Sequence, residues 1–388
     1  MDSERKCFCT FDNAFAELAY HATQKMNVNE IAFFSIFLIF IIGVLMLDLG
    51  VFDRKSHEVP FKEALLWTGV WMLLSFGFFM LLRLRGDLIH GLDSLDAIKN
   101  QVAEYKHSVD IDGLTYQQAL VLYRHNLSLE YLTGYLIEYA LSVDNVFVMI
   151  LIFLAFKVQK MYYKRVLFWG ILGAVVMRFL FIFLSASLIQ RFEWIMYIFG
   201  AFLVFTGIKM FLSRNKEEKI DTEAHPVVKL ASKYLPVYPH YFRQHFWFRK
   251  SATNKLFFTP LFIVLLVIEF TDVIFAVDSV PAIFSVTQDP YIVFFSNIFA
   301  ILGLRSLFFV VVNVIGLFHY LKHGLSILLA FIGVKMLLKE PLHDIGFTTA
   351  HSLYVVVGIL AVSILASLIF PNEQKKLEKA HLIASLKK

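Results

Sequence analysis

The sequence contains little charge and almost no cysteine. Of its 388 residues only 17% are charged, whereas 58% are hydrophobic and 42 are phenylalanine. One soluble core of this length could not bury so much apolar surface, so the composition excludes a soluble globular protein and predicts a polytopic membrane protein. The two cysteines, Cys7 and Cys9, are too few to frame a fold. We expect free thiols there, with a peripheral metal contact as the alternative.

No signal peptide and no enzyme motif is evident in the sequence, and we expect neither. Its first residues, MDSERKCFCTFDNAFAE, lack the basic region that a leader needs, and the first long apolar run begins only after Glu30. We therefore expect the first span to stay in the mature chain. Because no nucleophile with its base, phosphate-binding loop or soluble catalytic domain is evident, we expect neither enzymatic activity nor a permanently bound cofactor.

Apolar runs of the length that crosses a bilayer, roughly 20 residues, recur about nine times. They lie near residues 31–51, 64–82, 131–156, 166–189, 192–212, 257–286, 291–318, 322–339 and 350–370. The predicted fold class is therefore an all-α polytopic membrane protein that lies within the lipid bilayer.

Two connections between the spans are long. The first, 83–130, mixes acidic, basic and turn residues and predicts a small extracytoplasmic insert with one or two helices. The second, 213–256, contains the basic and aromatic stretch PVYPHYFRQHFWFRK, which beside a span is more typical of an anchor against lipid headgroups than of a nucleic-acid site. We predict a cytoplasmic loop there and no nucleic-acid partner.

Lysine and arginine set the predicted orientation. They are more numerous in the loops after the first, third, fifth and seventh spans and in the C-terminal tail than in the opposite loops. Because basic loops stay in the cytoplasm, we predict that the N-terminal segment, 1–30, lies outside the plasma (inner) membrane and that the basic tail, 371–388, lies inside.

Internal similarity divides most of the spans into two halves. The stretch EYALSVDNVF, which starts at Glu138, matches DVIFAVDSVPAIF, which starts at Asp272. The next span of each half carries one arginine, and the third spans contain AFLVFTGIKMFL and LAFIGVKMLL. We predict three-helix repeats at 131–212 and 257–339, with two peripheral helices at 31–82 and a last span at 340–370.

Each predicted repeat holds an odd number of spans, so the second repeat enters the membrane from the side opposite to the first. The repeats are therefore expected to be inverted, which is the usual build of a secondary transporter with its site near the midplane. A duplication kept only for structure is the alternative.

Acidic side chains within the spans need compensation. There are five of them: Glu138, Asp144, Glu269, Asp272 and Asp278. A charge at the bilayer centre costs a few kcal/mol, so each must be hydrated, paired or neutralised. Two deep arginines, Arg178 and Arg305, balance part of this charge. One interpretation is that these arginines only hold the helices together. The excess of acid favours the other interpretation, a bound cation or protons.

The expected metal ligands are hard oxygens, because no His or Cys lies at matching depth, and this set suits Mg²⁺, Ca²⁺ or Mn²⁺. Asp144 and Asp278 are equivalent in the two repeats, and we predict that they are the central ligands. The other predicted ligands lie on the same two spans: Glu138, Asn145, Glu269, Asp272 and Ser279. Since the ring of Pro281 clashes with the carbonyl of Val277, we expect a kink or an unwound turn around 277–279 that frees carbonyl oxygens.

The sequence resembles the TerC family of integral membrane proteins, named for tellurium resistance, in four segments: EYALSVDNVFV, FTPLFIVLLVIEFTDVIFAVDSVPAIF, SNIFAILGLRSLFF and FIGVKML. The resemblance runs from about Glu130 to Leu338. It implies inverted three-helix repeats and a role in manganese export and metal homeostasis. It also implies that the predicted ligands carry the acidic motifs of the family and that Arg178 and Arg305 occupy its arginine positions.

Two classes of function remain open. The first is an exporter that moves Mn²⁺ or a similar divalent cation outward, in exchange for protons. The second is a non-transporting membrane partner that aids the assembly or metal loading of other proteins. Tellurite transport, which only the family name suggests, fits poorly because a net-acidic site repels an oxyanion.

Overall fold

The computed structural model describes residues 28–48, 60–192, 194–213, 226–238, 240–241, 245–249, 256–314 and 320–369. Cys7, Cys9, most of the segment 1–30 and the tail 371–388 lie outside these residues. The predictions made for them therefore stay predictions.

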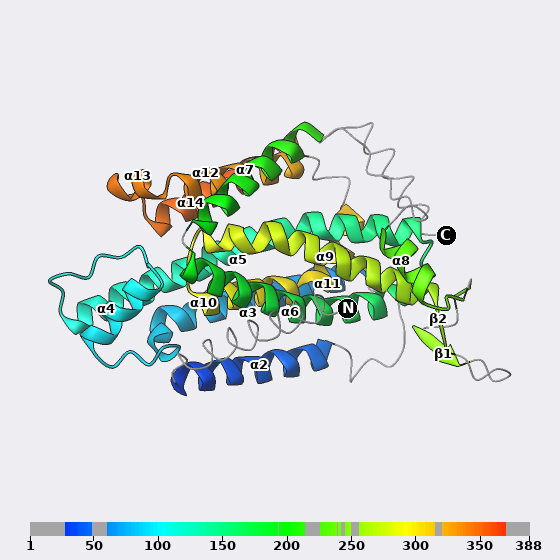
Figure 1. Ribbon diagram of the computed structural model, residues 1–388, viewed down its shortest axis with the longest axis horizontal. Helices are drawn as coiled ribbons and strands as arrows, with labels where there is room; N and C mark the ends of the chain where they lie inside the picture. The colour runs from blue at the N-terminus through cyan, green and yellow to red at the C-terminus, as the bar shows by residue number, and fades with distance from the viewer. Residues whose placement is uncertain are drawn as a thin grey trace, which may run out of the picture.

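The described chain is almost entirely helical (Figure 1). Its first helices are α2 (Val28–Asp48), α3 (Phe61–Arg85), α4 (Leu95–Glu104), α5 (Tyr116–Ala155), α6 (Lys160–Arg191) and α7 (Ile195–Ser213). The later helices are α8 (Pro226–Tyr234), α9 (Pro260–Phe284), α10 (Pro290–Leu302), α11 (Leu304–Val314), α12 (Leu321–Leu337), α13 (Lys339–Asp344) and α14 (Thr349–Ile369). A short 3-10 helix, η1 (Gly86–Leu88), follows α3, and two strands, β1 (Trp247–Arg249) and β2 (Leu256–Phe258), pair antiparallel.

Seven of the described helices are long and apolar enough to cross a bilayer alone: α2, α3, α5, α6, α7, α9 and α14. The pair α10 and α11, bent by 46°, is apolar enough when taken together and is either a broken eighth span or a re-entrant loop. Helix α12 has 17 residues, about 26 Å, slightly less than the roughly 30 Å hydrocarbon core. The predicted all-α polytopic membrane class is confirmed. Within the described residues seven or eight helices have the length of a span, where about nine were predicted.

Helix α5 is the longest, with 40 residues or about 60 Å. It begins at Tyr116, well before the apolar run near Tyr131, because Thr115 and Gln118 form a capping box that satisfies its first backbone N–H groups. Its first turns pack against η1 and α4. The insert predicted at 83–130 is therefore built partly from the start of a spanning helix.

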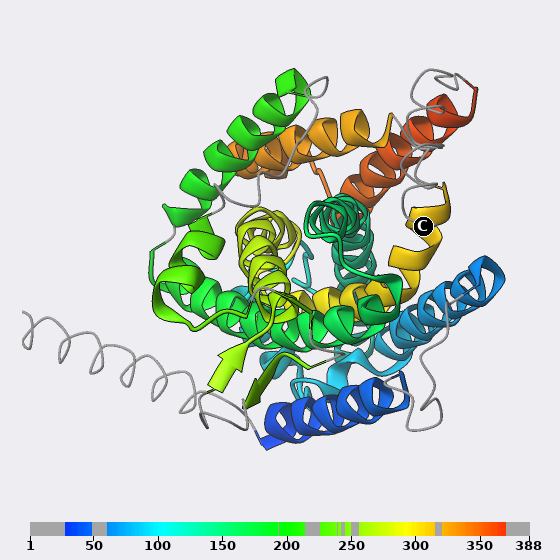
Figure 2. The same cartoon turned by 90° about the vertical axis from the view of Figure 1, so that its right-hand side faces the viewer.

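Helices α5 and α9 run near the middle of the molecule, and the other spans surround them (Figure 2). Helix α6 packs against α9, and α10 packs against α5. The closest helix pair is α7 with α12, where Gly207 and Gly333 let the backbones approach. A Cβ atom at Gly333 would lie only 2.6 Å from the carbonyl oxygen of Gly200. Small residues at such contacts are typical of helix association in membranes.

The helix pairs follow a pattern that two-fold-related halves would produce. The first helices of the two predicted repeats, α5 and α9, contact each other, and so do the second helices, α6 and α10, and the third, α7 and α12. The mixed contacts are also reciprocal, since α6 packs on α9 and α10 packs on α5. The inversion of the repeats stays a prediction.

The break in the second half lies at Gly303, between α10 and α11, two residues before Arg305. In contrast, α9 is continuous through 277–279, so this structure does not display the unwound turn expected there. Pro281 lies in the last turn of α9, where the carbonyl of Val277 loses only one hydrogen-bond donor before the helix ends. Proline so close to a helix end interrupts few bonds.

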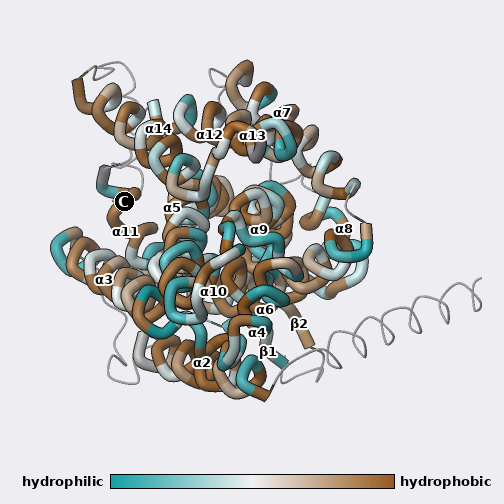
Figure 3. The backbone as a smooth tube through the Cα atoms, turned by 90° about the vertical axis from the view of Figure 1, so that its left-hand side faces the viewer, coloured by the Kyte–Doolittle hydropathy of each residue, from teal (hydrophilic) through white to brown (hydrophobic). Residues whose placement is uncertain are grey.

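The outer faces of the spans are apolar. Hydrophobic residues predominate along α2, α3 and α14 (Figure 3), and large side chains such as Ile36, Leu73 and Leu365 are exposed on them. Exposed apolar surface on this scale is expected of a protein surrounded by lipid tails.

Candidate ion-binding site

A fully buried arginine of α6 contacts three other helices at the centre of the molecule. Arg178 of α6 donates hydrogen bonds to Glu138 of α5 and, over 2.6 Å, to the amide oxygen Oδ1 of Asn297 on α10. Its second terminal nitrogen lies 3.5 Å from Oδ1 of Asp272 on α9. Glu138 and Asp272 are the positions that the internal similarity pairs. One guanidinium therefore binds both of these equivalent acids and balances one of their two charges.

Asn297 was not predicted from the sequence. Its amide nitrogen donates to the carbonyl oxygen of Val293 over 2.9 Å, which fixes the amide with its oxygen toward Arg178. The available signal was a polar pair, Ser296 and Asn297, within the apolar run YIVFFSNIFAIL. A polar residue at that depth is rarely without a partner.

The two acids predicted as central ligands lie outside this arginine cluster. Oδ1 of Asp144 lies 3.9 Å from the ammonium nitrogen of Lys322, at the start of α12. Asp278 has Thr206 and Lys209 of α7 as its electrostatic neighbours. Each acid thus stands on the first helix of one repeat and faces the third helix of the other. Lys322 was not predicted as a partner.

Glu269 and Arg305 occupy separate places. The carboxylate of Glu269 packs directly over Gly173 of α6, where a Cβ atom would lie 2.0 Å from Oε1. It also lines a surface groove between α6 and α9, near Trp169. Arg305 is half-buried at the start of α11, which packs against α3 and α5. The structure therefore brings Glu138, Asp272 and Arg178 into direct contact, and Glu269 is an electrostatic neighbour of Asp272. Asp144, Asp278 and Arg305 have other neighbours.

Several buried polar atoms of α5 and α9 have no hydrogen-bond partner within the described residues. They include Glu138 Oε2, Asn145 Nδ2, Asp272 Oδ2, Asp278 Oδ1 and Ser279 Oγ. A buried polar atom without a partner costs about 1–3 kcal/mol. Within the same described part of the chain, no three His, Cys, Asp or Glu side chains gather closely enough to hold a metal ion. The oxygen donors are thus present on two adjacent helices, and a single cage is not assembled in this conformation.

A second buried polar cluster lies at the end of the molecule that carries the insert. The ring of His90 bridges Oε1 of Glu30 at 2.7 Å and Oδ2 of Asp289 at 2.9 Å. Tyr291 donates to the other oxygen of Glu30 over 3.2 Å. These groups come from α2, the loop after η1 and the start of α10. The sequence predicted an extracytoplasmic insert but gave no signal for this cluster, because its partners lie up to 261 residues apart.

Charge explains how this cluster is stable when buried. Burial alone would lower the pKa of His90, but the carboxylates of Asp289 and Glu30 outweigh it and raise the pKa to about 9. Burial would raise the pKa of Asp289, yet the His90 imidazolium holds it below its usual value. A neighbouring pair repeats the arrangement, since Nδ1 of His107 lies 2.9 Å from Oε2 of Glu130. Glu130 raises the pKa of His107 against the effect of burial.

The helices and the buried charge define the class of protein: a multi-pass integral membrane protein with an ionic cluster inside its helix bundle. The chain belongs to the TerC family. The model of the "Integral membrane protein TerC family" matches residues 123–375, which confirms the resemblance seen in the sequence.

Curated relatives match most of the chain. An "Uncharacterized membrane protein STKORF319" of Myxococcus xanthus is 42% identical over 86% of this chain and 91% of its own length. A "Putative membrane-bound redox modulator Alx" of Escherichia coli (strain K12) is 40% identical over 82% of this chain and 89% of its own. An "Uncharacterized membrane protein" of Rickettsia bellii is 36% identical over 87% of this chain. No solved structure matches the chain.

Proposed function

We propose that the chain exports a divalent cation, Mn²⁺ first among them, across the plasma (inner) membrane in exchange for protons. One observation carries the proposal: α5 and α9 hold buried oxygens of Glu138, Asp272 and Asp278 that have no hydrogen-bond partner within the described residues. Carboxylate oxygens favour Mg²⁺, Ca²⁺ and Mn²⁺ over softer metals. The family resemblance favours Mn²⁺ among these.

The position of Asp144 and Asp278 supports alternating access. Each acid faces the third helix of the other repeat, and each has a lysine close by, Lys322 and Lys209 respectively. An incoming divalent ion competes with these lysines for the carboxylates. Because a hard divalent ion needs about six oxygens, binding must draw further donors toward Asp144 and Asp278. Asn145 and Ser279, next in sequence to the two acids, are the nearest candidates.

Arg178 has a different role in this proposal. It neutralises part of the charge on Glu138 and Asp272, so these two acids stay buried when no ion is bound. When an ion enters, Arg178 raises the barrier against a second cation. When the ion leaves, protons replace it on the carboxylates and keep the net charge of the core constant.

Two other functions stand beside this proposal. A non-transporting partner in membrane-protein assembly would use the same fold without moving an ion. The relatives named as redox modulators suggest redox chemistry, for which Cys7 and Cys9 are the only thiols in the sequence. Neither alternative uses the buried acids of α5 and α9.

Intracellular manganese in cells that express the chain separates these possibilities. We expect cells carrying the parent protein to hold less manganese and to tolerate more of it than cells carrying Asp144→Asn or Asp278→Asn. Asp112→Asn is the matched control, because Asp112 is exposed in the insert and lies 3.7 Å from Lys99. If both core variants leave manganese content and tolerance as in the parent, the proposed site is wrong.

A further inference from the structure

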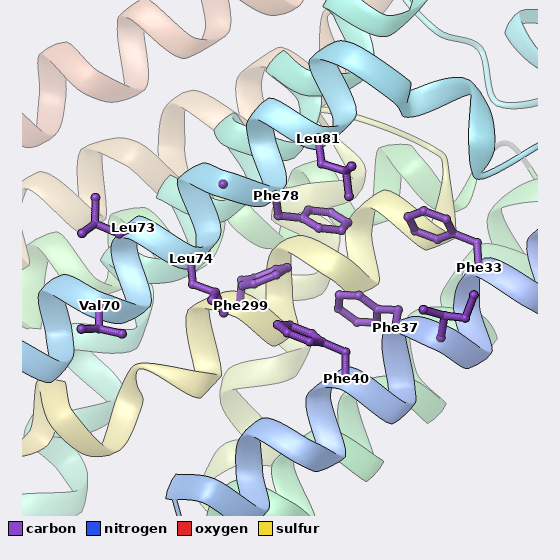
Figure 4. Close-up of a pocket in the computed structure, with 11 residues that line it drawn as sticks. Phe33, Phe37, Phe40, Val70, Leu73, Leu74, Phe78, Leu81 and Phe299 are labelled. Atoms are coloured by element: carbon purple, nitrogen blue, oxygen red, sulfur yellow. The ribbon is translucent and has the colours of Figure 1, made fainter.

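An apolar groove runs along the outside of the molecule between α2 and α3 (Figure 4). Phe33, Phe37 and Phe40 of α2 form one wall, residues 70–81 of α3 form the other, and Phe299 of α10 lies at the base. The groove has a volume of about 770 Å³, and every residue that lines it is apolar. Such a groove offers only dispersion and hydrophobic contact to an occupant.

The groove opens toward the bilayer. Both of its walls belong to helices long and apolar enough to cross a membrane. Ile36 and Leu73, at its edges, are exposed over 68% and 71% of their surface. Water is not a stable occupant of a purely apolar space that faces hydrocarbon. The neighbouring molecules able to fill it are therefore lipid chains or apolar protein segments.

The length of the groove corresponds to one leaflet. Along α3 its lining runs from Val70 to Leu81, which is about 17 Å at 1.5 Å per residue. One leaflet of the hydrocarbon core is about 15 Å deep. A transmembrane helix would cross both leaflets and so continue past the end of the groove. The acyl chain of a lipid stays within one leaflet and therefore matches the length of the groove.

One end of the groove is basic. Arg83 and Arg85 lie in the last turn of α3, and both are exposed. Arg85 follows Leu81 by four residues, so it lies on the same face of the helix, one turn beyond the lining. Arginine at a membrane interface binds lipid phosphate groups. The two arginines therefore lie at the position of the headgroup of a lipid whose acyl chain occupies the groove.

We propose that the groove between α2 and α3 is a binding site for one phospholipid, whose acyl chain lies against Phe37 and Phe299 and whose phosphate contacts Arg85. The lipid comes from the leaflet on the side of the insert, where α3 ends. It adds to the contacts that hold α2 against α3 and α10, among them the rings of Phe37 and Phe78, whose centroids are 5.7 Å apart.

Two glycines of α3 provide a matched test. Gly77 lines the groove, and a Cβ atom there would meet nothing within 4 Å. Gly69, on the same helix but outside the lining, has the same free space. Leucine at either position raises helix propensity by about the same amount. Gly77→Leu fills the groove, whereas Gly69→Leu leaves it open.

The measurement is native mass spectrometry of the purified full chain in detergent micelles that contain dioleoylphosphatidylglycerol. We expect the parent and Gly69→Leu to retain one lipid per chain, and Gly77→Leu to lose it. Arg85→Gln, at an exposed position that should not affect folding, should weaken retention about fivefold, since one interfacial arginine contributes about 1 kcal/mol.

Two outcomes would overturn the proposal. Equal retention of lipid by the parent, Gly77→Leu and Arg85→Gln would show that the bound lipid is unspecific. The second outcome is a parent that carries no lipid and is a dimer in the same spectra, while Gly77→Leu is a monomer. That result would assign the groove to a second copy of the chain.

Discussion

Arg178 is the residue on which the buried charge depends most. It is fully buried, and its contacts to Glu138, Asp272 and Asn297 come from three different helices. Removing one partner of a buried ion pair leaves the other charge uncompensated, which typically costs 3–5 kcal/mol.

Arg178→Gln should therefore lower the free energy of unfolding by about 3–5 kcal/mol, measured as a large drop in the thermal stability of the purified protein. Arg124→Gln is the control, because Arg124 pairs with Asp87 at 2.6 Å but both side chains are partly exposed. That variant should lose about 1 kcal/mol or less. Equal stability of the parent and Arg178→Gln would mean that Glu138 and Asp272 are compensated in another way.

Because of His90, the free energy of unfolding should fall as the pH becomes alkaline. Its pKa is raised from 6.5 to about 9 by Asp289 and Glu30, which outweigh the effect of burial. A raised pKa contributes stability that is fully present below pH 6.5 and is lost as the pH rises through 9. Tyr105, Tyr291 and His107 also face the cluster.

Thermal unfolding between pH 6.5 and 9.5 measures this effect. The parent should lose a few kcal/mol over that range, whereas His90→Gln should start less stable and change little. If the melting curves of the two proteins shift in parallel with pH, His90 is not the titrating group.

At the scale of the elements, the contact between α7 and α12 is the tightest. A Cβ atom at Gly207 would lie 2.8 Å from the backbone nitrogen of Ala330 and 2.8 Å from the carbonyl oxygen of Ser326. Both atoms belong to the backbone, so a side chain at Gly207 forces the helices apart.

Gly207→Ala should lower stability by about 1–3 kcal/mol, although alanine favours a helix. Gly358→Ala on α14 is the control, since a Cβ atom there meets nothing within 4 Å and should slightly stabilise the protein. Thermal stability of both variants checks this, and a Gly207→Ala protein as stable as the control would show that α7 and α12 separate freely.

The elements also show which features can be predicted from the sequence. The spans could be predicted because the apolar length of a helix is a local property, and α6 and α9 lie close to their predicted ranges. The start of α5 was not predicted, because the apolar run begins only near Tyr131, although Thr115 and Gln118 have the spacing of a capping box. The helix breaks at Gly303, whereas α9 stays helical through 277–279, because a proline in the last turn of a helix interrupts few hydrogen bonds.

The candidate site was only partly predictable, because spacing along a helix is local and contacts between helices are not. Spacing along α5 and α9 identified their acids, and the internal similarity paired Glu138 with Asp272. The partners Asn297 and Lys322, and the whole His90 cluster, arise from contacts between distant segments. Local periodicity carries no information about such contacts.

At the scale of the whole molecule, contacts between loops fix which segments share an end. His90 of the insert contacts Asp289, so the insert and the loop before α10 lie together. At the opposite end, the hydroxyl of Tyr241 donates to the carbonyl oxygen of Phe156 over 2.7 Å, which joins the basic loop to the end of α5. The pair β1 and β2 lies at the same end of the molecule (Figure 1). We expect these two ends to lie on the two sides of the membrane.

Cysteine labelling should place Lys160 in the cytoplasm and Gln288 outside. In a variant without Cys7 and Cys9, Gln288→Cys should react with an impermeant maleimide added to intact cells, and Lys160→Cys should react only after lysis. The reverse pattern would invert the orientation but not the grouping of the loops.

Ion flux through the purified protein tests the central claim most directly. Proteoliposomes with a Mn²⁺-sensitive dye and a pH dye report both ions at once. The parent and Asp112→Asn should move Mn²⁺ with protons in the opposite direction, and Asp144→Asn and Asp278→Asn should be slower by about tenfold or more, because each loses a charge-assisted contact of about 1.5–3 kcal/mol. Absence of Mn²⁺ flux in a stably folded parent, or equal flux in all four proteins, would contradict the account.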